Sequence, residues 1–273
     1  MRSTTLTAST ARLSPSTQQL VRRAALFVGF LLSGGMLNIN RVVLLGVLAV
    51  LVFLLRSPFN MIRREMAAVW IVVAIVFAVA LIGGGDLNVS ANLVRLANFV
   101  AGALLLLVYN DEPRDLLAVD AYPLVRLFAF QAILTVFVAT IAPGVFQPLE
   151  VNETVYNTVL MVLTFHVTIE DSTRLVRPDG FFWEPGVLQI YLNLYLFLSL
   201  FVFRRLRDAV IAAFSVLLTQ STSGVLAAWV LIGLAYWRHL GTATRNQKIF
   251  AAILAPVLLL PVSAIVYWNV QEK

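Results

Sequence analysis

Apolar residues run in long blocks along this chain, and short polar breaks separate the blocks. Blocks 66–82, 187–203 and 249–268 contain no charged side chain, block 93–109 has a single arginine near one end, and block 123–141 has one arginine inside it. A helix of roughly 20 mostly apolar residues crosses the hydrocarbon core of a bilayer, and a long arginine side chain can reach back to the bilayer surface. The pattern predicts one transmembrane helix in each of these blocks.

Two longer apolar regions each predict a pair of short helices. Region 20–55 is too long for one span and is broken by Asn-Ile-Asn-Arg at 38–41. Region 209–237 is free of charge, but Thr-Gln-Ser-Thr-Ser-Gly at 219–224 interrupts it near the middle. Each region is therefore predicted to cross the membrane and return, which brings the number of spans to about nine.

The charge of the connecting segments supports this topology. With the N-terminus inside the cell, fourteen of the 20 Lys and Arg residues fall on the cytoplasmic side and five on the outer side, as the positive-inside rule requires. Treating region 20–55 as one span would invert all later helices and place the basic turn 204–207 outside. The sequence predicts an all-α, polytopic membrane bundle with a cytoplasmic N-terminus and a periplasmic C-terminus.

The polar segments suggest a simple domain organisation. Residues 1–19 are rich in Ser and Thr and contain no acidic residue, which predicts a disordered cytoplasmic tail. Residues 20–273 are expected to form a single transmembrane domain with one large periplasmic loop at 142–184. The apolar stretch 155–168 inside this loop favours a loop folded over the membrane, and a solvated connector is the alternative.

Composition agrees with a membrane protein and excludes other classes. Hydrophobic residues make up 60% of the chain and charged residues 12%, against about 45–50% and about 25% in soluble domains. A net charge of +6 would suggest nucleic acid as the partner of a soluble protein, but here it mostly reports topology, so we expect no nucleic-acid partner. Cysteine is absent, which removes disulfides, thiolate nucleophiles and Cys-ligated zinc.

Candidate chemistry concentrates where the outer loop meets the next span. Pro185 suits the first turn of a helix, and Glu184 then occupies the cap position. Gln189 and Asn193 are four residues apart, so they share a face of this helix and can hydrogen-bond in the bundle interior.

Two arginines, Arg174 and Arg177, precede this helix at the membrane surface. Their guanidinium groups offer fixed positive charge where a phosphate would lie. A purely structural reading is the alternative, in which Glu184 only caps the helix and the arginines bind lipid headgroups.

The stretch that follows Arg177 reads Pro-Asp-Gly-Phe-Phe-Trp-Glu-Pro-Gly-Val-Leu-Gln-Ile-Tyr-Leu-Asn-Leu. It resembles the O-antigen polymerase and O-antigen ligase family of bacterial inner-membrane proteins. In that family a similar stretch ends the outer loop, and a basic cytoplasmic turn follows, here 204–207. A short hairpin with a Thr-x-Ser-Thr-or-Arg-x-Gly-like motif comes next, here 219–224. The resemblance covers about residues 174–237.

The resemblance implies a glycosyltransferase of surface polysaccharide biosynthesis, either of lipopolysaccharide or of exopolysaccharide. Such an enzyme moves a glycan from an undecaprenyl diphosphate carrier to an acceptor hydroxyl at the periplasmic face. The resemblance further implies a multi-pass protein of the inner membrane that needs no metal and no other cofactor. Its implied partners are the undecaprenyl-diphosphate-linked glycan, membrane lipid and other membrane proteins of polysaccharide assembly.

The resemblance also implies roles for individual residues. Arg174 and Arg177 would stabilise the charge that develops on the leaving diphosphate. Glu184 would orient one of these arginines or accept the proton of the acceptor hydroxyl. The candidate substrate-binding residues are Gln189, Asn193, Thr219, Ser221 and Thr222.

The sequence departs from the family pattern at its C-terminal end. Family members continue into a second outer loop that supplies another arginine and a histidine, and then into further spans. The sequence ends at Lys273, where that loop would begin, and neither His166 nor His239 is placed to replace its histidine. We therefore expect a fragment or an inactive member of the family. A transporter of lipid-linked glycan or small solute and a non-catalytic membrane scaffold remain alternative functions.

Overall fold

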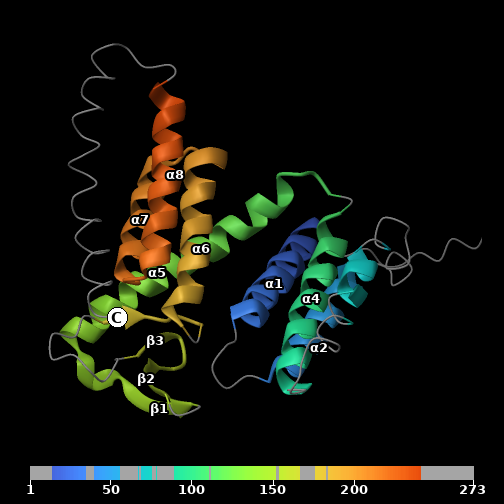
Figure 1. Cartoon of the computed structure of the whole chain (residues 1–273), viewed down its shortest axis with the longest axis horizontal. Helices are drawn as coiled ribbons and strands as arrows, with labels where there is room; N and C mark the ends of the chain where they lie inside the picture. Colours follow the sequence, from blue (N-terminus) through green and yellow to red (C-terminus); the bar gives the residue numbers. More distant parts are fainter. Residues whose placement is uncertain are drawn as a thin grey trace, which may run out of the picture. The chain divides into compact units, whose positions relative to one another are not determined.

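The computed structural model describes residues 14–34, 40–55, 89–110, 112–151, 154–166, 176–182 and 184–240, with short helical pieces between 67 and 78. Most of these residues are helical (Figure 1). The helices are α1 (Pro15–Gly34), α2 (Arg41–Leu55), α4 (Val89–Tyr109), α5 (Leu116–Ile141), α6 (Pro185–Phe197), α7 (Leu206–Leu218) and α8 (Thr222–Leu240). A 3-10 turn, η2 (Pro143–Val145), follows α5, and a π-helical segment, η3 (Leu198–Val202), continues α6.

The predicted mostly helical content is confirmed. Two described segments, Leu116–Ile141 and Pro185–Val202, are long and apolar enough to cross a membrane, and Arg41–Leu55 and Leu96–Tyr109 are shorter apolar helices. The helix predicted at 249–268 lies outside the described residues, and of the one predicted at 66–82 only residues 67, 69–75 and 78 are described. The count of nine spans stays a prediction.

Both regions that were predicted to form helix pairs do contain two helices. α1 and α2 occupy region 20–55, and α7 and α8 occupy region 209–237. The second pair is joined by a three-residue turn in which Gln220 has a φ of 51°. Figure 1 shows α7 and α8 beside α6, with which both make contacts.

Contacts between Cα atoms divide the chain into two compact units. The first comprises Met1–Leu32 and Arg41–Asp120, and the second comprises Ser33–Asn40 and Ala121–Lys273. In the first unit α1 and α4 approach closely at Gly29. A Cβ atom built on this glycine would lie only 2.5 Å from Leu105 Cδ1. Small residues commonly permit such close helix packing in membrane proteins.

The all-α prediction requires a correction, because the segment predicted to be the periplasmic loop contains a four-stranded antiparallel sheet in the order β1-β2-β3-β4. The strands are β1 (Gln147–Val151), β2 (Thr154–Val159), β3 (Leu163–His166) and β4 (Arg177–Pro178). The all-α prediction left the apolar stretch 155–168 without strands, in a loop folded over the membrane. Its β-branched and aromatic residues instead favour strands, and a tight turn with positive φ at Leu160 and Met161 reverses the chain between β2 and β3.

The sheet is fixed to the C-terminal half of α5. Phe165 of β3 packs with Phe146 and with Ala139 of α5 in one buried cluster, and the two phenyl rings meet edge to face at 4.9 Å between centroids. Gln131 of α5 donates a hydrogen bond from Nε2 to the carbonyl of Val162 in the β2–β3 turn. The sheet is thus a folded element attached to α5.

The second unit exposes apolar residues and buries polar ones. On α5, α7 and α8 the exposed large hydrophobic residues recur every three or four positions, so they form one stripe along each helix. The stripes are Leu127, Phe130, Leu134, Phe137 and Ile141 on α5, Leu206, Val210, Phe214 and Leu217 on α7, and Leu226, Val230, Leu234 and Trp237 on α8. Buried polar residues of the same unit include Gln131, Gln189, Asn193, Asp208, Ser215 and Thr219.

Candidate functional site

α6 begins as predicted. Glu184 is the N-cap residue with extended backbone, and Pro185 occupies the first turn. The exposed Glu184 side chain makes no cap hydrogen bond. It lies over the first turn instead, since a Cβ atom built on Gly186 would be 3.1 Å from Glu184 Oε1. Its carboxylate is therefore not used to close the helix end.

The predicted interaction of Gln189 with Asn193 is confirmed. Asn193 Nδ2 lies 3.0 Å from both the backbone oxygen and Oε1 of Gln189, and 3.1 Å from the backbone oxygen of Gly224. Three acceptors around Nδ2 fix the orientation of the amide. They leave Asn193 Oδ1 buried without a hydrogen-bond partner among the described residues.

Gly224 brings the first turn of α8 directly against α6. A Cβ atom built at this position would lie 2.6 Å from Gln189 Oε1 and 3.0 Å from Gln189 Cβ. Only glycine fits this distance without displacing the amide. The two sequence motifs, one at the start of α6 and one in the hairpin, therefore contact each other.

The turn of the hairpin is held by its own hydroxyl groups. Thr219 is fully buried, and its Oγ1 donates to the carbonyl of Val216 at 2.7 Å and accepts from the N–H of Ser221 at 3.4 Å. Ser221 Oγ lies 3.2 Å from Ser223 Oγ. Thr222 begins α8. These bonds orient the backbone of the turn.

Arg177 reaches this turn from β4. Its Nε donates to the backbone oxygen of Thr219 at 3.4 Å, and its side chain is half-buried. In the part of the chain that the structure describes, no carboxylate pairs with Arg177, Glu184 included. Arg174 lies outside the described residues. Arg177 thus keeps its positive charge and most of its N–H donors available for an anion.

A second polar cluster, which sequence reasoning missed, surrounds Asp208 at the start of α7. Tyr122 and Tyr195 donate hydroxyl hydrogen bonds to its two oxygens at 2.6 and 3.0 Å. Arg126 Nε and Arg205 Nη1 lie farther away, at 3.9 and 4.0 Å. An acid just after the basic turn 204–207, in the first turn of an apolar helix, was the signal that could have revealed it.

The pKa of Asp208 is lowered by this surrounding. Burial of the carboxyl group acts to raise the pKa, but the hydrogen bonds from Tyr122 and Tyr195, together with the charges of Arg126 and Arg205, outweigh it. The carboxylate is therefore ionised at neutral pH.

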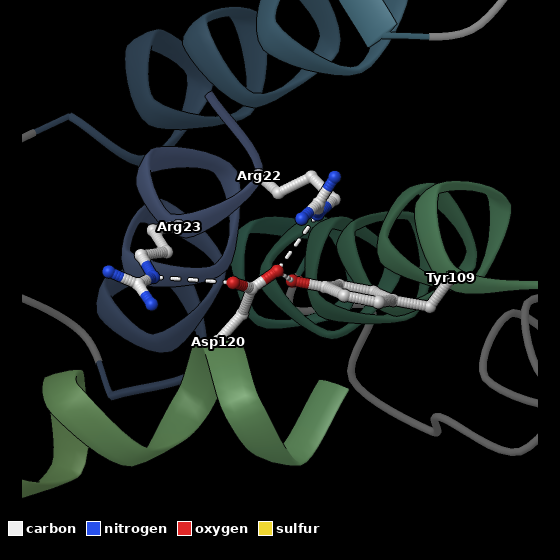
Figure 2. Close-up of polar contacts among 4 residues, drawn as sticks. All are labelled: Arg22, Arg23, Tyr109 and Asp120. Carbon is white, nitrogen blue, oxygen red and sulfur yellow. Dashed lines mark hydrogen bonds and ion pairs between the residues drawn. The ribbon is translucent and has the colours of Figure 1, made fainter. Parts of the chain in front are cut away.

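A third cluster lies in the first unit and joins three helices (Figure 2). Asp120 of α5 is fully buried, with Arg22 Nε 2.9 Å from Oδ2 and Arg23 Nε 3.2 Å from Oδ1. Tyr109, the last residue of α4, donates its hydroxyl to Oδ2 at 3.3 Å. Arg22 and Arg23 are among the cytoplasmic basic residues of the predicted topology, and in the structure both pair with this one acid.

Neither a family model, a curated protein nor a solved structure matches this chain. Among the described residues no group of His, Cys, Asp or Glu side chains is arranged to hold a metal ion.

Proposed function

We propose that the chain is a multi-pass protein of the bacterial inner membrane, with about nine helices, a cytoplasmic N-terminus and a periplasmic C-terminus. The distribution of polarity in the second unit supports this proposal. Apolar stripes on α5, α7 and α8 are exposed, whereas amide, hydroxyl and carboxylate groups are buried between helices. Water would penalise such large exposed apolar patches, while a bilayer favours them and forces polar groups to find partners inside the bundle.

Within this setting, we propose a glycan transferase similar to O-antigen polymerases and ligases. One observation carries the proposal: three segments that the resemblance singles out converge in the folded chain. Arg177 from the end of the outer loop contacts Thr219 of the hairpin turn, and Asn193 of α6 contacts Gly224 at the other end of the same motif. A site that binds a lipid-linked glycan with residues from these three segments requires such a convergence.

Arg177 is assigned to the diphosphate of the lipid carrier. In the reaction the acceptor hydroxyl oxygen attacks the anomeric carbon of the glycan, the bond from that carbon to the diphosphate oxygen breaks, and undecaprenyl diphosphate leaves. Negative charge grows on the leaving oxygen, and a guanidinium group already in place stabilises it. Arg174 is given the same role by the resemblance alone.

Glu184 is assigned to the proton of the acceptor hydroxyl. Its carboxylate is exposed at the start of α6, and among the described residues it makes neither a cap bond nor an ion pair. A free carboxylate can accept a proton from an attacking hydroxyl. This arrangement supports the base role over the orientation of Arg177.

The amides and hydroxyls of the site are assigned mainly to positioning. Gln189 and Asn193 hold the first turn of α8, and Thr219 and Ser221 shape the turn that carries the oxygen bound by Arg177. Thr222 lies at the start of α8 beside them. The buried Oδ1 of Asn193 is the remaining acceptor for a hydroxyl of the substrate or for water.

The test is complementation of a strain that lacks the gene. The intact gene should restore polymerised or attached surface glycan, and Arg177→Ala should leave lipid-linked repeat units accumulated at the periplasmic face. Arg238→Ala, which removes an exposed arginine of α8, serves as the charge-matched control and should complement fully. Accumulation at the cytoplasmic face would instead indicate a transporter, and an unchanged surface glycan in the deletion strain would indicate a scaffold.

A further inference from the structure

The cluster around Asp208 lies at the opposite end of α7 from the hairpin turn. α7 has 13 residues, so the two ends are about 20 Å apart. Arg126, Arg205 and Asp208 are therefore too far from Arg177 to belong to the proposed transferase site, and they need a separate explanation.

The tyrosines, and not the arginines, satisfy the carboxylate of Asp208. Their hydroxyls approach to 2.6 and 3.0 Å, whereas the nearest arginine nitrogens stay at 3.9 and 4.0 Å. A charge-assisted N–H to carboxylate bond is normally about 2.7–2.9 Å long. The carboxylate thus attracts both arginines without occupying their N–H donors.

The two guanidinium groups are held near each other and remain accessible. Arg126 is nearest one oxygen of Asp208 and Arg205 the other. Arg126 lies over the ring of Phe130 at 5.4 Å and Arg205 over the ring of Tyr122 at 5.5 Å, and their side chains are 45% and 58% exposed. Such contacts favour a fixed position for each cation.

The surroundings add positive charge and apolar surface. Arg204 and Arg207, the near neighbours of Arg205 in the sequence, are also exposed. The arginine cluster is defined as Arg126, Arg204, Arg205 and Arg207. The exposed apolar stripe of α5 begins next to Arg126, and that of α7 begins between Arg205 and Arg207, as the neighbours in sequence are Leu127 and Leu206. An anion with long apolar chains would match both features, whereas a free anion would match only the first.

We propose that the arginine cluster binds the phosphodiester headgroup of an anionic phospholipid, whose acyl chains lie along the exposed stripes of α5 and α7. Arginine forms bidentate hydrogen bonds with phosphate oxygens, and basic residues near a membrane surface contribute about 1 kcal/mol each to the binding of anionic lipid. The proposal rests on the proposed membrane embedding, and it does not depend on glycan transfer.

The experiment titrates the purified full chain in mild detergent with phosphatidylglycerol and, separately, with phosphatidylcholine, and counts bound lipid by native mass spectrometry. The unaltered protein should bind phosphatidylglycerol more tightly than phosphatidylcholine. The double variant Arg126→Gln/Arg205→Gln should lose about thirtyfold in apparent affinity, at about fivefold per removed charge. The control Arg114→Gln/Arg238→Gln removes two exposed arginines elsewhere and should stay within about twofold of the unaltered protein.

Several outcomes would overturn the proposal. Equal affinity of the double variant and the control, or equal binding of the two lipids, excludes a specific headgroup site. Displacement of phosphatidylglycerol by millimolar inorganic phosphate would show that the cluster holds a free anion rather than a lipid. If the double variant does not fold, Arg205→Gln alone decides the question, because that side chain is largely exposed, and about fivefold weaker binding is expected.

The same preparation separates this proposal from membrane embedding. A chain that stays in solution without detergent and does not enter phosphatidylcholine vesicles would contradict embedding. A chain that enters vesicles but shows no preference for phosphatidylglycerol would contradict the lipid site alone.

Discussion

Arginine side chains make different kinds of contact in the two units of this protein. In the first unit Arg22 and Arg23 both approach Asp120, and a fully buried carboxylate neutralises part of their charge. In the second unit Arg177 donates to the backbone oxygen of Thr219, and no carboxylate of the described residues pairs with it. The first arrangement ties helices together, whereas the second leaves charge available for a ligand. The contacts of these arginines, and not their positions along the chain, distinguish the two cases.

Removing Asp120 is expected to have the largest effect on stability. Asp120→Ala leaves two arginines without their common partner, and breaking a buried ion pair in this way costs about 3–5 kcal/mol. The matched variant Asp115→Ala removes an exposed acid five residues before Asp120, at the residue that precedes α5, and should cost no more than about 1 kcal/mol, the usual cost of losing a helix cap. Unfolding in detergent measures both, and equal stability of the two variants would contradict a structural role for the Asp120 cluster.

Tyr122→Phe extends the comparison to an acid that tyrosines satisfy. The variant removes the 2.6 Å hydrogen bond to Asp208 and keeps the ring, and a hydrogen bond to a charged group contributes about 1.5–3 kcal/mol. The expected loss of unfolding free energy lies in that range. Tyr236→Phe is a suitable control because its hydroxyl has no partner among the described residues, and it should cost nothing.

Gly224→Ala and Gly233→Ala should act in opposite directions although both lie on α8. A Cβ atom at 224 would meet Gln189 Oε1 at 2.6 Å, whereas one at 233 has no atom within 4 Å. The first should destabilise by about 1–3 kcal/mol through overpacking, and the second should stabilise by up to about 1 kcal/mol because alanine favours a helix. Denaturation of both variants measures the difference, and a stable Gly224→Ala protein would mean that α8 does not contact α6 closely.

Asp208 should contribute to the pH dependence of stability, and its effect is expected to be the smallest of those considered. Because the pKa of Asp208 is lowered on folding, its contribution is present above the ordinary carboxyl pKa and is lost as the pH falls below it. Unfolding midpoints at pH 7 and pH 3 should therefore differ less in Asp208→Asn than in the unaltered protein. An unchanged pH difference would assign the acid sensitivity to other carboxyl groups.

Local features of the site were predictable from the sequence, and contacts between distant residues were not. The start of α6 at Glu184 and Pro185, and the contact of Gln189 with Asn193, follow from spacing within one turn or two of a helix. The separation of α1 from α2 and of α7 from α8 follows from polar residues within apolar blocks. These features depend only on near neighbours in the sequence.

The remaining features require partners far along the chain. Asp120 and Arg22 are 98 residues apart, and Asp208 and Tyr122 are 86 apart. The sheet likewise forms only through pairing of four strands, and β4 is only two residues long. Helical periodicity carries no information about such pairings, so both buried acids and the sheet became visible only in the folded chain.

The rate of glycan transfer tests whether Arg177, unlike Arg22 and Arg23, acts on a ligand. Purified protein in vesicles would be given lipid-linked repeat units and acceptor, and transfer would be measured for the unaltered protein, Arg177→Ala and Arg177→Lys. Arg177→Ala should slow transfer by a factor of about 10²–10³, in line with removal of one preorganised donor. Arg177→Lys should recover only part of the rate, because a single ammonium group replaces the planar guanidinium fork. The unfolding free energy of Arg177→Ala should fall by less than about 1 kcal/mol, whereas that of Asp120→Ala should fall by more. Transfer at the full rate by a folded Arg177→Ala protein would show that Arg177 does not stabilise the leaving diphosphate.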